Sequence, residues 1–364
     1  MRLMITPVCR VISAFQNTPR PFRQICKVRY LCRMSATDST TKVFVTRYVP
    51  PVGVEVLSQH CQVDQWDTQD PIPRAELLKR VQGVDALYCL LTERIDKEVL
   101  DAAGPQLKVV STMSVGYDHV DVAECQKRNI RVGFTPDVLT NATAELTMSL
   151  LLTTSRRLYE GIKAVREGKW GTWNPVWLCG QGLDGATVGI LGLGRIGFAV
   201  GQRLRPFGIG RLLYTDSEAK SYDSDVGAER VDFDTLCRQS DFILGCCALT
   251  EENKGIFNKD AYSKMKKTAI LINTSRGGLV NQEDLYVALS TGQILAAGLD
   301  VTVPEPLPLD NPLMKLDNCI VLPHIGSATE KSRAAMSELA GQNIVAALKG
   351  EKMPREVPYE SLNF

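Results

Sequence analysis

Six short apolar runs follow one another between residues 186 and 322, and most of them are followed by a residue capable of chemistry. The spacers between most of the runs are long enough for helices, which is typical of a parallel sheet with helical crossovers. The runs are residues 186–191, 211–215, 241–248, 268–273, 296–301 and 319–322. Ligands bind at the carboxyl ends of the strands in such sheets. The predicted site therefore consists of residues at or just beyond those ends: Gly192, Asp216, Arg276, Asp300, Glu305 and His324.

A second, smaller set of runs precedes this region and predicts a domain of its own. Its predicted strands are residues 43–45, 62–66, 84–91, 107–113 and 130–134, with helices at 73–82, 97–103 and 120–128. Apolar residues at helical spacing continue from 142 to about 167 and predict one helix that links the two domains. The same spacing at 330–348 predicts a helix that packs back on the first domain.

The predicted fold is α/β, with two Rossmann- or flavodoxin-like domains, each a parallel sheet with helices on both faces. The dinucleotide-binding domain, 142–324, is inserted into a discontinuous substrate domain made of 41–141 plus 325–364. Residues 1–40 stand apart, because residues 1–37 hold seven Arg or Lys and no acid. That composition resembles a mitochondrial transit peptide. A disordered extension, or a little-used upstream start before Met34, is the alternative.

Charge and composition exclude several classes of protein. The net charge of +1 over 364 residues gives no global field toward nucleic acid or an anionic membrane. No apolar stretch reaches the ~18–20 residues that a bilayer requires. Eleven cysteines without a C-x-x-C pair, and only three histidines, predict neither a disulfide framework nor a metal site. Reduced thiols in an intracellular protein, most simply a cytoplasmic one, are expected.

A glycine pattern follows the first strand of the larger domain. The segment from Thr187 to Gly197 contains G-x-G-x-x-G at Gly192, Gly194 and Gly197, between a predicted strand and a helix-like run. These glycines permit a tight turn, a close approach to a pyrophosphate and close helix–strand packing. The helix N-terminus adds N–H groups and partial positive charge. A dinucleotide site is predicted, and a glycine-rich turn without a ligand is the alternative.

Asp216 ends the next predicted strand, 19 residues beyond Gly197. An acid at this place binds both ribose hydroxyls and repels a 2′-phosphate, so it favours NAD over NADP. A 2′-phosphate site requires a nearby cation, and the first one along the chain is Lys220. A solvated aspartate in a turn is the alternative.

Three side chains beyond neighbouring strand ends predict the chemistry. His324 is the natural proton donor to a carbonyl oxygen at neutral pH. Glu305 would orient the imidazole from its other nitrogen, and the planar fork of Arg276 suits a carboxylate. Together they fit hydride transfer to a 2-oxo acid. Taken singly, each residue has an ordinary alternative: a packing histidine, a solvated loop acid and a surface ion-pair partner.

At these residues the chain resembles the D-isomer-specific 2-hydroxyacid dehydrogenase family. The matching segments are 188–197, 273–278, 298–301 with 305–306, and 322–328, and the likeness runs from about 42 to 354. Within the family, segments 111–116, 135–140, 177–180 and 304–308 are similar to the glyoxylate/hydroxypyruvate reductases. The resemblance implies that Arg276, Glu305 and His324 form the catalytic set. Reduced nicotinamide would deliver hydride to glyoxylate or hydroxypyruvate.

The resemblance also implies further site residues. Val115 and Gly116 would bind the substrate carboxylate through backbone N–H groups, with Leu91 nearby. A homodimer through the large domain is implied, and Trp173 would either close a pocket, across the dimer, or pack in the interface. The implied cofactor contacts are Gly192, Gly194, Arg195, Ile196, Gly197, Asp216, Ser217, Thr143 and Asp300.

The sequence leaves alternatives for the preferred cofactor and for the activity. Subgroup members that prefer NADPH have a pair similar to Gly-Arg where this chain has Asp216 and Ser217. The likeness to the subgroup therefore favours NADPH, while the local charge favours NADH. The alternatives to oxo-acid reduction are an NAD-sensing scaffold of the corepressor kind and a family dehydrogenase for another 2-oxo acid.

Overall fold

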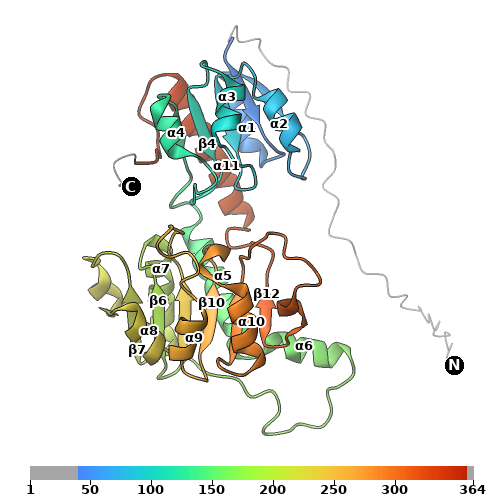
Figure 1. The fold of residues 1–364 in the computed structure, drawn as a ribbon, viewed down its shortest axis with the longest axis vertical. Coiled ribbons are helices and arrows are strands. Elements are labelled where there is room, and N and C mark those ends of the chain that lie inside the picture. The colour runs from blue at the N-terminus through green and yellow to red at the C-terminus, as the bar shows by residue number, and fades with distance from the viewer. Residues whose placement is uncertain (1–39, 359–364) are drawn as a thin grey trace, which may run out of the picture. The chain divides into compact units, whose positions relative to one another are not determined.

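The computed structural model describes residues 40–358, and two parallel sheets organise them (Figure 1). Every strand pair within both sheets is parallel, so the predicted α/β fold with two parallel sheets is confirmed. The basic N-terminal residues 1–37 fall outside the described residues. Among the described residues, no helix combines the length and apolar character that crossing a membrane requires.

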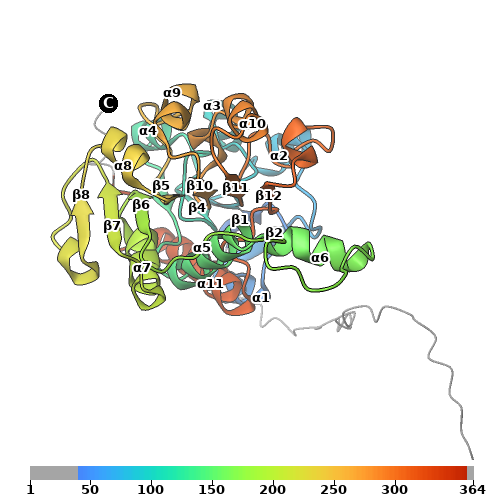
Figure 2. The same ribbon diagram turned by 90° about the horizontal axis from the view of Figure 1, so that it is seen from below.

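The first sheet has the order β2-β1-β3-β4-β5. Its strands are β1 (Lys42–Val45), β2 (Gln62–Gln65), β3 (Ala86–Cys89), β4 (Val109–Thr112) and β5 (Arg131–Gly133). Alternate strand residues belong to two apolar clusters, one on each face. Helices α2 (Arg74–Arg80), α3 (Lys97–Ala103) and α4 (Val122–Lys127) cover one face. Helices α1 (Pro51–Ser58) and α11 (Glu330–Leu348) cover the other, so a helix from the end of the chain packs on this sheet (Figure 2).

The second sheet has the order β12-β11-β10-β9-β6-β7-β8. Its strands are β6 (Thr187–Leu191), β7 (Arg211–Thr215), β8 (Ala228–Arg230), β9 (Phe242–Gly245), β10 (Ile270–Asn273), β11 (Ala296–Leu299) and β12 (Cys319–Val321). Helices α5 (Thr140–Ser155) and α7 (Arg195–Leu204) pack on one face. Helices α8 (Phe233–Gln239), α9 (Lys259–Lys264) and α10 (Gln282–Ser290) pack on the other. The domain boundaries at 141/142 and 324/325 stay a prediction.

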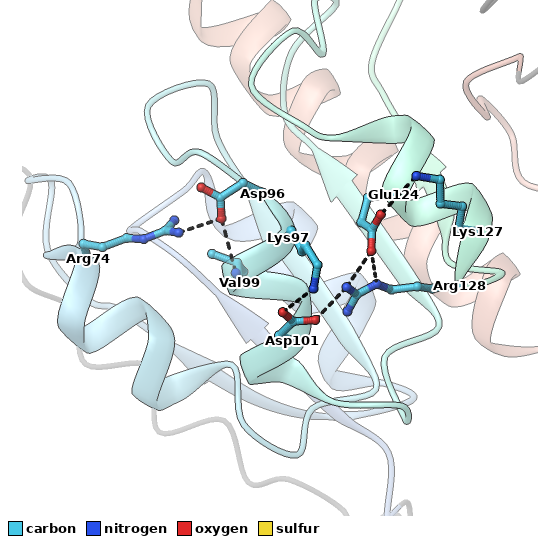
Figure 3. Close-up of polar contacts among 8 residues, drawn as sticks. All are labelled: Arg74, Asp96, Lys97, Val99, Asp101, Glu124, Lys127 and Arg128. Atoms are coloured by element: carbon cyan, nitrogen blue, oxygen red, sulfur yellow. Dashed lines mark hydrogen bonds and ion pairs between the residues drawn. The ribbon is translucent and has the colours of Figure 1, made fainter.

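A network of ion pairs joins three helices on the surface of the first sheet (Figure 3). Asp96 caps α3 and also accepts a hydrogen bond from Arg74 of α2 at 2.6 Å. Asp101 of α3 pairs with Arg128 at 2.6 Å, and Arg128 pairs with Glu124 of α4 at the same distance. Such partly exposed pairs add little stability each; one group links α2 to the start of α3, and the other links α3 to α4.

Several sequence predictions about the elements were wrong. The single helix expected at 142–167 is two helices, α5 and α6 (Leu158–Arg166), because Arg157 has the left-handed φ of 53° and ends the helical path. Helix α1 was not predicted, since its proline, glycine and valines are poor helix formers, yet Gly53 lets α1 approach Ser337 of α11 closely. Cys246 and Cys247 follow β9 rather than lying within it.

Candidate active site

The residues predicted for the chemistry follow three adjacent strands of the second sheet. Arg276 follows β10, Glu305 follows β11 and His324 follows β12, and these strands are neighbours in the order β12-β11-β10. Because the strands are parallel, the segments that follow them start from one edge of the sheet. Gly192 and Asp216, which follow β6 and β7, start from the same edge.

His324 and Glu305 form a hydrogen-bonded pair. Nδ1 of His324 lies 2.8 Å from Oε2 of Glu305, and both side chains are about one-third exposed or less, at 28% and 33%. Oε1 of Glu305 accepts a hydrogen bond from the backbone N–H of Thr302 at 3.0 Å. This second contact fixes the carboxylate, which in turn orients the imidazole and leaves Nε2 as the nitrogen available to a reacting oxygen.

The charge of Glu305 is favoured by its neighbours. Burial alone would raise the pKa of Glu305, but the hydrogen bond and charge of His324 outweigh it, and Thr302 and Arg276 act in the same direction. The pKa of the carboxyl is therefore below its usual range. Glu305 is therefore ionised at neutral pH and presents a negative charge to the ring nitrogen that it orients.

Asp300 holds the segment that carries His324. Its backbone carbonyl accepts from the N–H of His324 at 2.9 Å, while its two carboxylate oxygens accept from Ile325 and Gly326 at 2.8 Å each. His324 itself adopts a left-handed φ of 54°, which is unfavourable for a residue with a side chain. Burial raises the pKa of Asp300. Three hydrogen bonds to one aspartate thus maintain the strained turn that aims the imidazole.

Arg276 lies between the two sheets. Its backbone carbonyl accepts from the side chain of buried Asn273 at 2.8 Å, and its Nη1 donates to the carbonyl of Ser275 at 2.8 Å. Its Nε donates to Oδ1 of Asp118, on the loop after β4 of the first sheet, at 3.0 Å. A Cβ at Gly116 would collide with Nη2 of Arg276, so the guanidinium lies directly against this glycine.

The other predicted substrate residues differ in where they lie relative to the site. Val115 adjoins Gly116 in the loop that meets Arg276, and half-buried Leu91 follows β3 of the same sheet. Trp173 is 81% exposed. No hydrogen bond or ring contact within the described chain joins Trp173 to the site.

The glycine turn after β6 has a shape that fits a dinucleotide. Gly192 has a φ of 94°, and a Cβ there would meet Cys247 at 2.6 Å. A Cβ at Gly197 would collide with the carbonyl of Gly192, whereas a Cβ at Gly194 would meet nothing within 4 Å. Gly194 therefore faces open space at the N-terminus of α7, where a pyrophosphate could approach the backbone.

Residues around this turn connect it to the first sheet. Nε of Arg195 pairs with Oδ1 of Asp137 at 2.7 Å, and Asp137 also pairs with Arg355. Ile196 packs against apolar clusters of both sheets. Thr143 of α5 is buried, and its Cγ2 lies 3.4 Å from where a Cβ at Gly326 would be, which brings α5 beside the His324 segment.

The turn after β7 is richer in cations than the sequence suggested. Asp216 accepts from the N–H of Leu193 at 3.0 Å, and Lys220 lies 3.1 Å from its other oxygen. Ser217 donates to the same oxygen at 3.2 Å. Arg230 from β8 donates to the carbonyls of Asp216 and Ser217 at 3.1 and 3.2 Å. Lys220 and Arg230 beside Asp216 offset the repulsion between its carboxylate and a 2′-phosphate.

Three of these residues were not predicted from the sequence. Asp118 and Asp137 pair with the two arginines of the site, and Arg230 comes from a strand that was not predicted. Of the three, only Asp118 could have been found from the sequence, because it lies two residues after Gly116, which was itself predicted to bind the substrate. Within residues 40–358, no group of three or more His, Cys, Asp or Glu is arranged to hold a metal ion.

Known proteins with similar sequences and structures place this chain in a family. Residues 148–326 match the family described as D-isomer specific 2-hydroxyacid dehydrogenase, NAD binding domain. The human glyoxylate reductase/hydroxypyruvate reductase is 55% identical over 319 residues, which cover 87% of this chain and 97% of that protein.

Two solved structures extend the comparison. A protein from Thermus thermophilus has a TM-score of 0.82 and 41% identity, covering 87% of this chain and 100% of its own. An NADPH-dependent glyoxylate/hydroxypyruvate reductase from Sinorhizobium meliloti, solved with NADP and malonate, has a TM-score of 0.76 and 29% identity, covering 88% and 97%. With these likenesses over nearly the whole described chain, the protein belongs to the D-isomer-specific 2-hydroxyacid dehydrogenase family.

Proposed function

We propose that this protein reduces glyoxylate and hydroxypyruvate to glycolate and D-glycerate with NADH or NADPH. The observation that carries the proposal is the His324–Glu305 pair, 2.8 Å apart, on the sheet edge that also bears Arg276 and the glycine turn. Relatives named for these two substrates support it. The bound reduced nicotinamide supplies the hydride, and the chain supplies binding, orientation and a proton.

The substrate carboxylate binds between the two sheets. Nη2 of Arg276 and the backbone N–H groups of Val115 and Gly116 are the donors that we assign to it. His324 donates a proton from Nε2 to the carbonyl oxygen as the hydride reaches the carbon. Glu305 holds the other ring nitrogen, and its negative charge stabilises the protonated ring before transfer.

A dinucleotide would be held along the same edge of the sheet. Gly192, Gly194, Arg195, Ile196 and Gly197 form its pyrophosphate site, with the N–H groups at the start of α7 as donors. Asp216 and Ser217 would hold the adenosine ribose, and Thr143 and Asp300 would hold the nicotinamide end. Lys220 and Arg230 beside Asp216 support the use of NADPH as well as NADH.

A second copy of the chain completes the enzyme in this proposal. Helix α6 and the segment that follows it, which extend beyond the second sheet (Figure 2), expose many large apolar side chains. They are Leu158, Tyr159, Ile162, Val165, Trp170, Trp173, Val176 and Trp177. An apolar surface of this kind marks a protein interface. A homodimer would bury it and would let Trp173 reach the pocket of the partner subunit.

The cellular location is proposed to be the cytoplasm, with mitochondrial import through the basic residues 1–37 as the alternative. Mass spectrometry of the native N-terminus separates the two, because an imported precursor loses its basic residues.

The decisive experiment is a kcat/KM grid of glyoxylate, hydroxypyruvate, pyruvate and 3-phosphohydroxypyruvate against NADH and NADPH. The highest values are expected for the first two acids. A protein that binds NADH but turns over none of the four would be a nucleotide-sensing scaffold. Highest turnover of another acid would identify a different dehydrogenase of the family.

A further inference from the structure

Arg276 is held by Asp118, a residue to which the proposed chemistry assigns no role. Its Nε donates to Oδ1 of Asp118 at 3.0 Å, and its Nη1 donates to the carbonyl of Ser275 at 2.8 Å. Among the described residues, nothing accepts a hydrogen bond from Nη2, which lies against Gly116. Two of the three guanidinium nitrogens are therefore fixed by protein atoms, and the third faces the loop assigned to the substrate carboxylate.

Asp118 stands on a loop that is itself anchored in the first sheet. Buried Thr112 at the end of β4 lies 2.8 Å from the hydroxyl of Ser114 and 3.0 Å from Nε2 of His119. Ser114 donates to the carbonyl of Gly116 at 2.6 Å, and the carbonyl of His119 accepts from Ile95 at 2.9 Å. The loop is thus tied down on both sides of Asp118, which holds the position of its backbone; the side chain itself is 46% exposed and pairs with Arg276.

The charges around this contact favour an ion pair between Asp118 and Arg276. Burial alone would raise the pKa of Asp118, but the charge and hydrogen bond of Arg276 outweigh it, so the pKa is below its usual range. Burial lowers the pKa of the adjacent His119 to about 4, so this imidazole is neutral at physiological pH. Arg276 is then the cation that pairs with Asp118.

We propose that Asp118 is a positioning residue for Arg276. Building on the proposed function, the pair fixes the guanidinium across the two sheets so that Nη2 meets the oxo-acid carboxylate beside Gly116. A long arginine side chain loses much rotamer freedom on binding, and the pair with Asp118 removes that freedom before the substrate arrives. In this proposal Asp118 acts on substrate affinity through Arg276 and not through a contact of its own.

The test uses Asp118→Asn in the full-length protein, with glyoxylate turnover and with the affinity for oxamate, an unreactive carboxylate shaped like a 2-oxo acid. We expect KM for glyoxylate and Kd for oxamate to rise about tenfold, as for the loss of a charge-assisted hydrogen bond. NADH affinity should stay within about twofold and kcat should change less than KM. In an Arg276→Lys background, Asp118→Asn should add less than about twofold, because the two residues act as one unit.

The matched control is Asp64→Asn, which breaks another aspartate–arginine pair on the first sheet, with Arg80 at 3.1 Å. It should leave KM, oxamate affinity and kcat unchanged. Unchanged glyoxylate KM and oxamate affinity in Asp118→Asn would overturn the proposal while leaving the function standing, even if the melting temperature fell. An effect of Asp118→Asn that persists in full in the Arg276→Lys background would also overturn it.

The two proposals fail in distinguishable ways. A wild-type protein that binds oxamate in the presence of NADH but turns over no oxo acid would refute the function, and the oxamate comparison would still decide the role of Asp118. A wild-type protein that neither binds oxamate nor turns over any of the four oxo acids would overturn both.

Discussion

The glycine turn after β6 and the loops after β10, β11 and β12 share one sheet edge but are built differently. The turn is a matter of backbone shape: Gly192 has a positive φ, and a Cβ at Gly197 would collide with a carbonyl. The loops depend on side chains, and each important one has a partner, as in the 2.8 Å contact of His324 with Glu305. The glycine turn should therefore lose its function when a substitution adds atoms, whereas the loops should lose theirs when a substitution removes one partner of a side-chain pair.

The largest effect should come from removing the imidazole. His324→Ala is expected to reduce kcat by the ~10²–10⁴-fold typical of losing a general acid, while Kd for NADH changes little. Stopped-flow turnover and NADH fluorescence titration measure the two. His60→Ala, which removes an exposed histidine after α1, is the control. Near-normal turnover of His324→Ala would refute the role of proton donor.

The next effect separates shape from stability within the glycine turn. Gly194→Ala adds a methyl group where nothing lies within 4 Å, so the melting temperature should be unchanged. The same methyl group would occupy the space assigned to the pyrophosphate, and Kd for NADH should rise about tenfold or more. Gly182→Ala, which also meets nothing within 4 Å, should change neither quantity.

Gly197→Ala provides the opposite case. Its methyl group would collide with the carbonyl of Gly192, so both stability and NADH affinity should fall. If Gly194→Ala bound NADH normally, the dinucleotide would not approach the backbone at this turn.

The strand ends and the contacts between distant residues differ in how far the sequence could predict them. The strands of the second sheet that carry the site were identifiable because buried parallel strands are short apolar runs, and residues just beyond their ends share an edge. The contact of His324 with Glu305 could be anticipated for that reason, since it involves adjacent strands and residues only 19 positions apart.

The partners of the arginines could not be predicted in this way. Asp118 and Arg276 are 158 positions apart and belong to different sheets, so their contact depends on how the two sheets face each other. Arg230 was missed because β8 is an edge strand of three residues, Ala-Glu-Arg, with no apolar run. The helix break at Arg157 was missed because an αL residue leaves no trace in the spacing of apolar side chains.

A comparable effect, smaller than that of removing the imidazole, concerns the orienting acid. Glu305→Gln should reduce kcat by about 10- to 100-fold, because the amide keeps a hydrogen bond but loses the charge that favours the protonated ring. The pKa of Glu305 is lowered, so in the wild type the carboxylate persists down to below its usual value of ~4.3 and the acid limb of reduction lies there. In the variant that acid limb should vanish, because the amide does not titrate. An unchanged pH–rate profile would contradict a catalytic role for the pair of Glu305 and His324.

The smallest effect should come from the cations beside Asp216. Arg230 is exposed and donates to two backbone carbonyls, so its guanidinium has donors left for a 2′-phosphate. Arg230→Ala should raise KM for NADPH about three- to tenfold and leave KM for NADH nearly unchanged, because only NADPH carries that group. Arg238→Ala, an exposed arginine of α8, is the control. Equal losses with both cofactors would mean that Arg230 supports the shape of the Asp216 turn and does not bind the 2′-phosphate. The Asp216 turn would then act through its backbone shape, like the glycine turn, and not through paired side chains.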